Sequence, residues 1–91
     1  MADVRNNEDA RRYELVEDDH VIGIAAYVDR GDHMVFPHTE IAASRRGQGL
    51  GAQLVRAALD DARRRGRQVV PACWYVAEFI DDNAEYHDLV A

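Results

Sequence analysis

The strongest hydrophobic pattern in the chain predicts a long amphipathic helix over residues 50–65. Apolar residues recur there at helical spacing and define one face, namely Leu50, Leu54, Val55, Ala58, Leu59 and Ala62. On the opposite face Arg56, Asp60 and Arg64 lie four residues apart, where opposite charges attract each other. Gly66 follows the arginine-rich last turn and is typical of the position just past a helix C-terminus.

Four other segments have the alternation or the length of β-strands. Residues 12–17 alternate, residues 21–28 are apolar on both faces, residues 33–41 are extended, and residues 68–73 form a short apolar run. Turn residues separate the first three segments, so we expect these strands to form an antiparallel meander. The run at 68–73 follows the helix, which predicts that it lies parallel to the strand at 33–41 through a right-handed crossover.

Two prolines interrupt the strands on either side of the helix. Neither Pro37 nor Pro71 can donate a backbone hydrogen bond to a neighbouring strand. We expect the two strands to pair at one end and to separate at the other, leaving backbone groups free between them. Simple alternation places Met34, Phe36, His38 and Glu40 on one face, whereas a bulge at Pro37 would reverse the faces of the second half.

The two ends of the chain carry weaker patterns. Residues 1–10 are polar and lack periodicity, which predicts a flexible lead-in, and residues 11–91 form a single domain. Residues 74–91 predict one short helix and a second helical turn. The expected fold class is α/β, or more strictly α+β, with a mixed, mostly antiparallel sheet whose splayed parallel pair flanks one long helix, plus a short C-terminal helix.

Composition narrows the classes of function. The 91 residues suffice for one small domain, and no apolar run reaches the roughly 20 residues of a membrane span, so we expect a cytoplasmic protein with no membrane partner. Cys73 is the single cysteine, which excludes an internal disulfide. The net charge of −6 disfavours nucleic acid as a partner and mildly favours cationic substrates such as amines.

Residues 45–51, called the glycine loop below, have the composition of an anion-binding site. Gly47, Gly49 and Gly51 alternate with other residues directly before the predicted helix. Glycine reaches positive φ values without steric cost, so successive N–H groups can point into one concavity beside the positive end of the helix. This arrangement favours phosphate or pyrophosphate, and a tight strand-to-helix turn is the alternative explanation. Arg45 and Arg46 either pair with phosphate oxygens or remain solvated.

Several motifs in order along the chain resemble those of the GNAT superfamily of N-acetyltransferases. Arg46, Gly49 and Gly51 occupy the positions of its Arg-x-x-Gly-x-Gly signature. The resemblance covers residues 12–90 and is closest to a group of very small GNAT-like predicted acetyltransferases. The motifs that carry it read HTE at 38–40, RGQGLG at 46–51, PAC at 71–73 and EYHDLV at 85–90. The resemblance implies a truncated GNAT fold.

The same resemblance implies acetyl-CoA (coenzyme A) as the cofactor and an amine as the acceptor. The pyrophosphate would rest on N–H groups of the glycine loop, and the pantetheine arm would enter the gap between the two proline-containing strands. The implied cofactor-binding residues are Ile41, Ala42, Arg45, Arg46, Gly47, Gln48, Gly49, Leu50, Gly51 and Ala52. The sequence specifies neither the acceptor nor the oligomeric state.

Acetyl transfer to an amine needs a base, a polarised thioester carbonyl and a proton for the departing thiolate. Glu40 is the candidate base if partial burial makes its carboxylate basic enough, and His38 lies close enough to share that task. A surface carboxylate and a structural histidine are the alternative interpretations. Cys73 is either a nucleophile that carries the acetyl group or a packing residue. A backbone N–H near Ile41 is expected to polarise the carbonyl.

The remaining residues bear on the proton donor, on metal binding and on other possible functions. Tyr75 or Tyr86 is a candidate proton donor to the thiolate, although buried tyrosines are commonly packing residues. The histidines show no metal-ligand spacing with each other or with the cysteine, so no metal is expected. Two other functions fit the sequence: a non-catalytic acyl-CoA-binding or sensing module, and an interaction domain that docks a protein through Trp74, Tyr75 and Phe79.

Overall fold

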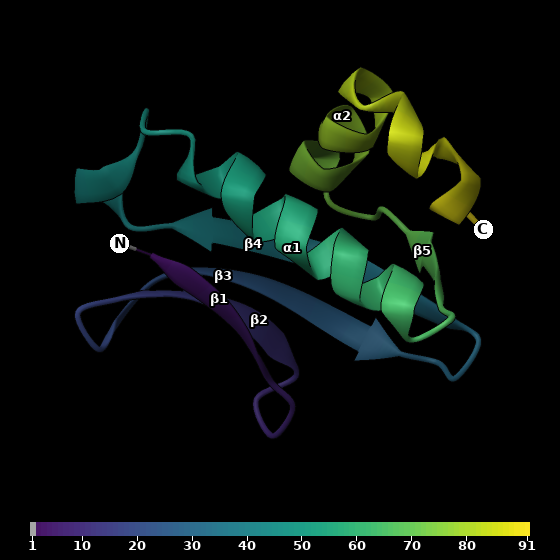
Figure 1. Cartoon of the computed structure of the whole chain (residues 1–91), viewed down its shortest axis with the longest axis horizontal. Helices are drawn as coiled ribbons and strands as arrows, with labels where there is room; N and C mark the ends of the chain where they lie inside the picture. The colour runs from purple at the N-terminus through teal and green to yellow at the C-terminus, as the bar shows by residue number, and fades with distance from the viewer. Residues whose placement is uncertain (1) are drawn as a thin grey trace.

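The computed structural model describes residues 2–91 and contains a five-stranded sheet whose strands follow one another in chain order. The first four strands pair with one another in antiparallel order, and the fifth lies parallel to the fourth. Figure 1 shows α1 running along one face of this sheet, with the C-terminal helices beside it. The elements are β1 (Asp3–Asn7), β2 (Arg12–Glu17), β3 (His20–Asp29), β4 (His33–Ile41), η1 (Ala43–Arg45), α1 (Leu50–Arg64), β5 (Gln68–Val70), α2 (Trp74–Asp82) and η2 (Ala84–Leu89).

The N-terminal segment is part of the sheet. We predicted a lead-in over residues 1–10, which is wrong for Asp3–Asn7, because these residues form β1 and pair with β2. The physical reason is Glu14, whose side chain is only 1% exposed although it lies on β2. Arg5 and Asn7 donate hydrogen bonds of 2.9 and 3.1 Å to its carboxylate, and Arg12 donates one of 2.7 Å. The prediction for Met1 lies outside the described residues.

The meander and the crossover agree with the sequence pattern. The segment at 12–17 is β2, and β3 and β4 pair in the predicted antiparallel order. Residues 33–35 of β4 pair in parallel with residues 68–70 of β5, which is shorter than the predicted strand at 68–73. Pro71 explains the early end of β5, because proline has no N–H with which to continue the pairing.

The helix α1 packs its apolar face on the sheet and forms the core with it. The buried residues of α1 are Leu54, Val55, Ala58, Leu59 and Ala62, all on the predicted face. They pack with the sheet residues Tyr13, Leu15, Ala25, Tyr27, Met34, Phe36 and Val69. Burying several large apolar side chains at about 25 cal/mol per Å² supplies the main driving force for this fold.

A bulge at Pro37 divides β4 into two halves that face opposite ways. The register passes from Val28↔Val35 to Ala26↔His38, so one residue of β3 lies opposite two residues of β4. Met34 is buried under α1, whereas His38 and Glu40 are exposed. Simple alternation, which placed all three on one face, is therefore wrong, and the alternative with a reversing bulge is the one observed.

The C-terminal segment forms the predicted short helix and helical turn. α2 and η2 pack beside α1, and the Tyr86 hydroxyl donates a hydrogen bond of 2.7 Å to Asp60 of α1. The guanidinium of Arg56 lies over the rings of Phe79 and Tyr86, at 5.3 and 5.5 Å from their centroids. Val90 forms a bridge with Val69 of β5, which brings the chain back to the sheet.

Candidate functional site

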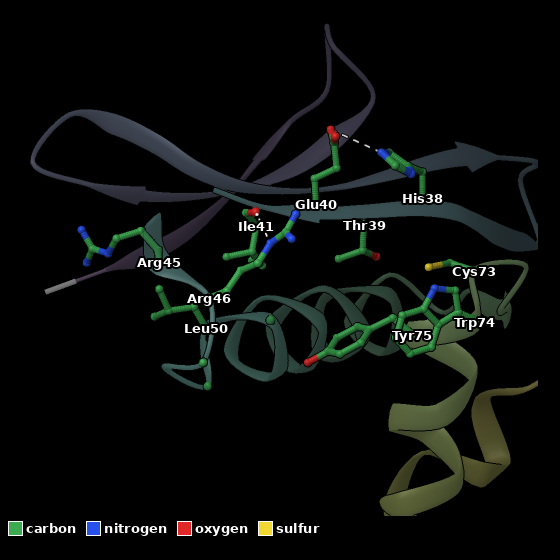
Figure 2. A pocket seen from close by; sticks show the side chains of 13 residues that line it. His38, Thr39, Glu40, Ile41, Arg45, Arg46, Leu50, Cys73, Trp74 and Tyr75 are labelled. Atoms are coloured by element: carbon green, nitrogen blue, oxygen red, sulfur yellow. Dashed lines mark hydrogen bonds and ion pairs between the residues drawn. The ribbon is translucent and has the colours of Figure 1, made fainter. Parts of the chain in front are cut away.

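A pocket of about 670 Å³ opens between the second half of β4, the glycine loop and the start of α2. Figure 2 shows the glycine loop at one end of this pocket and Cys73 with Trp74 at the other. The lining residues are His38, Thr39, Glu40, Ile41, Arg45, Arg46, Gly47, Gly49, Leu50, Gly51, Cys73, Trp74 and Tyr75. Its size is within the range of small-molecule sites in proteins.

Two of the three glycines in the loop have backbone conformations that disfavour other residues. Gly47 and Gly49 have φ values of 80° and 74°, in the left-handed region. Gly49 precedes α1 as its N-cap, and no side chain caps the helix or places an acidic group in its first turn. The N-terminal N–H groups of α1 therefore remain available to an anion at this end of the pocket.

Gly51 differs from the other two glycines of the loop, because its φ value is not positive and the constraint on it is one of space. A Cβ atom at this position would lie 2.7 Å from the hydroxyl oxygen of Tyr75, closer than such atoms approach each other in proteins. The absence of a side chain lets the Tyr75 ring lie over the first turn of α1 (Figure 2). Tyr75 therefore borders the glycine-loop end of the pocket.

The two arginines of the loop have different environments. Arg45 forms an ion pair with Glu17 of β2, and Figure 2 shows its side chain directed away from the pocket centre. Arg46 is exposed and donates a long hydrogen bond of 3.4 Å from Nε to the Ile41 carbonyl oxygen. Arg46 is therefore the loop arginine whose charge stands beside the pocket.

The two parallel strands separate beyond their short paired segment. The last backbone link between them is the hydrogen bond of 2.8 Å from the Cys73 N–H to the Phe36 carbonyl. The Ala42 N–H donates to Ile22 on the β3 side, so strand alternation turns the backbone groups of Thr39 and Ile41 toward the gap. The predicted splay, with free backbone groups on β4, is thus present in the structure.

His38 and Glu40 lie together on the face of β4 that is turned away from α1. The distance from His38 Nε2 to Glu40 Oε2 is 3.3 Å, which confirms that the two residues share a face. Figure 2 shows both side chains on the opposite side of β4 from Thr39 and Cys73. The Glu40 side chain is 63% exposed, so the partial burial expected for a strong carboxylate base is absent.

Cys73 is buried at the N-cap of α2 and lines the opposite end of the pocket from the glycine loop. Burial raises the pKa of its thiol, but the N–H groups of Val76 and Tyr75 and the nearby Thr39 outweigh burial and lower that pKa overall. A lowered pKa increases the fraction of thiolate, which is the nucleophilic form.

The two tyrosines considered as proton donors are not equivalent. The Tyr86 hydroxyl is bonded to Asp60 and receives a hydrogen bond of 3.2 Å from Arg56, and Tyr86 does not line the pocket. Tyr86 as the donor to a thiolate is therefore wrong. The Tyr75 hydroxyl lies beside Gly51, at the loop end of the pocket and not beside Cys73. Burial raises the pKa of Tyr75, with a smaller effect from Glu78.

Most of the residues predicted for cofactor binding meet at this pocket. Ile41, Arg45, Arg46, Gly47, Gly49, Leu50 and Gly51 line it, whereas Ala42, Gln48 and Ala52 are not among its lining residues. Trp74 is 73% exposed at the mouth, with its ring at 5.7 Å from that of Tyr75. Sequence reasoning missed Thr39, which the bulge turns into the pocket, and Pro37 was the signal that identifies it.

Residues 2–91 contain neither a metal centre nor a membrane-spanning helix. Within residues 2–91, no three His, Cys, Asp or Glu side chains are placed so that they hold a metal ion. In the same part of the chain, no helix has the length and the apolar character needed to cross a bilayer.

Comparison with known proteins identifies the family. The family model described as GCN5-related N-acetyl-transferase matches residues 12–89, which include β2 through η2 and the whole pocket. The chain belongs to the GCN5-related N-acetyltransferase family. The match begins at β2, so β1 lies outside the matched segment. The resemblance noted from the sequence motifs is confirmed.

Individual relatives of this GCN5-related chain are more distant. Protein NATD1 of Bos taurus is 35% identical over 46 residues, a match that covers 50% of this chain and 41% of NATD1. The match therefore covers less than half the length of this curated relative.

Two solved structures share the fold of this GCN5-related chain. A GCN5-like protein from Staphylococcus aureus, solved by NMR, has a TM-score of 0.74 at 16% identity and covers 98% of this chain and 87% of its own. A GNAT family acetyltransferase from Elizabethkingia anophelis, crystallised with acetyl-CoA bound, has a TM-score of 0.61 at 13% identity and covers 80% of this chain and 51% of its own. The expected GNAT fold is therefore confirmed.

Proposed function

We propose that this chain is an acetyl-CoA-dependent N-acetyltransferase that acts on a small or exposed amine. The observation that carries the proposal is one pocket with the glycine loop at one end and a splayed pair of strands with Cys73 at the other. Family membership supports the reaction class, and the acetyl-CoA bound to the structural relative from Elizabethkingia anophelis supports the cofactor.

The residues of the pocket fit the parts of acetyl-CoA. The N–H groups of the glycine loop and of the first turn of α1 hold the pyrophosphate, and Arg46 adds a positive charge beside it. The free backbone groups of Thr39 and Ile41 pair with the amides of the pantetheine arm, as one strand pairs with another. Acetyl-CoA supplies the acetyl group as an activated thioester at the Cys73 end.

The pair formed by His38 and Glu40 serves as the base for the acceptor amine. Imidazole is a common proton acceptor in enzyme sites, and Glu40 lies 3.3 Å from the Nε2 of His38, so the carboxylate orients the ring. Both side chains stand on the open face of the sheet, which directs the amine to the gap from the side opposite α1. A backbone N–H of β4 on the side of the gap is the donor for the carbonyl oxygen.

Cys73 offers a second route for the same overall reaction. Its thiolate would accept the acetyl group first and pass it to the amine afterwards, with the coenzyme released as the free thiol in either route. The two routes differ in one measurement: full retention of turnover by Cys73→Ala excludes an acetyl-cysteine, whereas loss of turnover with intact cofactor binding supports it.

The first experiment measures binding and transfer separately. Thermal unfolding is followed with acetyl-CoA and with adenosine as the matched control, because a ligand at 100 times its Kd adds about 2.7 kcal/mol to the free energy of unfolding. Acetylated product is then detected by mass spectrometry across a panel of amines and lysine-containing peptides. We expect stabilisation by acetyl-CoA and product from at least one cationic amine.

The outcomes separate the candidate functions. Glu40→Gln should lower kcat while it leaves stabilisation by acetyl-CoA unchanged. Stabilisation without product for any amine, and with no effect of Glu40→Gln, would instead identify a non-catalytic acyl-CoA-binding module. No stabilisation by acetyl-CoA at all would contradict the cofactor assignment and leave the interaction domain with exposed Trp74 as the remaining function.

A further inference from the structure

The Cys73 end of the pocket contains a hydroxyl group whose hydrogen-bonding capacity is unused. Thr39 Oγ1 is buried from solvent, and no described residue meets the geometry of a full hydrogen bond with it. Leaving a buried polar atom without a partner costs about 1–3 kcal/mol, so such atoms commonly mark a functional requirement. Figure 2 shows this oxygen turned toward the sulfur of Cys73 across the gap between β4 and α2.

The sulfur lies between two elements that can offer donors. Cys73 is the N-cap of α2 and its sulfur forms no capping hydrogen bond, but the N–H groups of Tyr75 and Val76 in the first turn of that helix contribute to the lowered pKa of the thiol. Thr39 approaches from β4 and completes the environment on the other side. A neutral thiol needs few donors, whereas a thiolate accepts several hydrogen bonds and is stabilised by a helix N-terminus.

We propose that Thr39 positions the Cys73 sulfur and stabilises it as a thiolate, so that Thr39, Cys73 and the first turn of α2 form a sulfur-anion site at the Cys73 end of the pocket. Thr39 is a positioning residue, because it acts on the sulfur of Cys73. The use of this site in acetyl transfer rests on the proposed function, but the state of the thiol does not.

The titratable side chains around Cys73 leave neutral donors, such as Thr39, as the groups that stabilise its thiolate. Tyr75 is the titratable side chain that follows Cys73 on α2, and burial raises its pKa, so it is neutral near pH 7. His38 and Glu40 leave β4 on the opposite face. Donation by neutral groups is therefore the main cause of the lowered pKa of the Cys73 thiol.

The experiment measures alkylation of the native, cofactor-free protein by iodoacetamide as a function of pH, with detection by mass spectrometry. Because the chain has one cysteine, all label reports on Cys73. We expect Thr39→Val, which keeps the shape and removes the hydroxyl, to move the alkylation midpoint to higher pH. The expected rate at pH 7 falls about tenfold, which corresponds to about 1.4 kcal/mol.

Matched variants separate this role from packing. Thr39→Ser keeps the hydroxyl and should retain the wild-type midpoint, and Ser44→Ala removes an exposed hydroxyl from η1 and should change nothing. If Thr39→Val loses its fold by circular dichroism, Thr39→Ala removes the same hydroxyl without an added methyl group. An unchanged midpoint in a folded variant that lacks the hydroxyl overturns the proposal, whether or not the protein transfers acetyl groups.

Discussion

The two ends of α1 are constructed in opposite ways. At the N-terminal end, Gly49 is the cap, no side chain caps the helix, and the N–H groups face the pocket. At the C-terminal end, Asp61 accepts hydrogen bonds from Tyr13 at 2.6 Å and from Arg65 at 2.8 Å, and Arg63 pairs with Asp88 at 2.9 Å. Side-chain hydrogen bonds therefore stabilise the C-terminal end of α1, whereas the backbone donors at its N-terminal end remain available to a ligand.

The largest expected effect comes from two glycines with the same backbone conformation. Gly49 has a φ value of 74° and Gly66 of 70°, and neither has a neighbouring atom within 4 Å of the Cβ position. Alanine at either position strains the backbone by about 1–2 kcal/mol. Only Gly49→Ala should also abolish the stabilisation of about 2.7 kcal/mol expected from acetyl-CoA at 100 times its Kd, as measured by thermal unfolding.

Gly66→Ala is the control for strain in this pair. It should lower the melting temperature by a similar amount and leave the response to acetyl-CoA intact. Equal loss of the response in both variants would show that the two ends of α1 do not differ in function.

The next largest effect is expected at the C-terminal end of α1. Asp61→Asn leaves the Tyr13 hydroxyl and the Arg65 guanidinium without their charged acceptor, so we expect a loss of about 1–3 kcal/mol in the free energy of unfolding, measured by urea denaturation. The Kd for acetyl-CoA should remain unchanged. A weakened Kd would connect the two ends of the helix and break the comparison.

The stabilisation by Asp61 should also depend on pH. Burial raises the pKa of this carboxyl, but hydrogen bonds from Tyr13, Arg65 and Arg64 outweigh burial and hold the pKa below its ordinary value. A carboxylate with a lowered folded-state pKa stabilises the protein fully above its unfolded pKa of about 3.9, and the contribution is lost as pH falls through the folded pKa. The difference between wild type and Asp61→Asn should therefore be constant near neutral pH and shrink in acid.

A smaller effect is expected at the contact between Gly51 and Tyr75. Because a Cβ atom at position 51 would lie 2.7 Å from the Tyr75 hydroxyl, Gly51→Ala displaces the ring toward the pocket. We expect the Kd for acetyl-CoA, measured by calorimetry, to rise about tenfold, or about 1.4 kcal/mol. Adding Tyr75→Phe removes the closest atom and should restore part of the affinity. No recovery in the double variant would place the effect of Gly51 in the phosphate contact itself.

The smallest effect concerns the two arginines of the glycine loop. Arg46→Ala should weaken acetyl-CoA binding a few-fold, with a difference from wild type that shrinks as salt is added, because its exposed charge is screened. Arg45→Ala removes the ion pair with Glu17, worth about 0.5 kcal/mol in stability, and should change the Kd less. The reverse order would show that Arg45 leaves Glu17 when the coenzyme binds.

The sequence predicted the parts of the fold whose patterns are local. The helix at 50–65 follows from apolar residues at helical spacing, and β2 follows from alternation over 12–17. β1 was missed because the contact that holds it to β2 is made by Glu14. A glutamate in a strand is expected to face solvent, and only the donors on β1 explain why this one is buried. The stability of β1 comes from a contact between segments, which no local pattern reveals.

The site was predictable to a similar degree. The glycine loop predicts an anion site because its glycines, its arginines and the start of the helix are adjacent in the chain. Two features of the site were not predicted. The exposure of Thr39 to the pocket depends on how the bulge at Pro37 reverses the faces of β4, and the position of Tyr75 depends on a contact between α1 and α2. Residues brought together by a crossover carry no common signature along the sequence.

The buried carboxylate of Glu14 also sets how this protein can change. Its three donors, Arg5, Asn7 and Arg12, come from two strands, and the loss of any one leaves a shielded negative charge with fewer donors. Substitutions at these four positions are therefore interdependent, and family members should exchange them as a set, for example for an apolar group. Trimming residues 2–7 as though they were a tail would remove two of the donors at once, so β1 belongs to the folded unit.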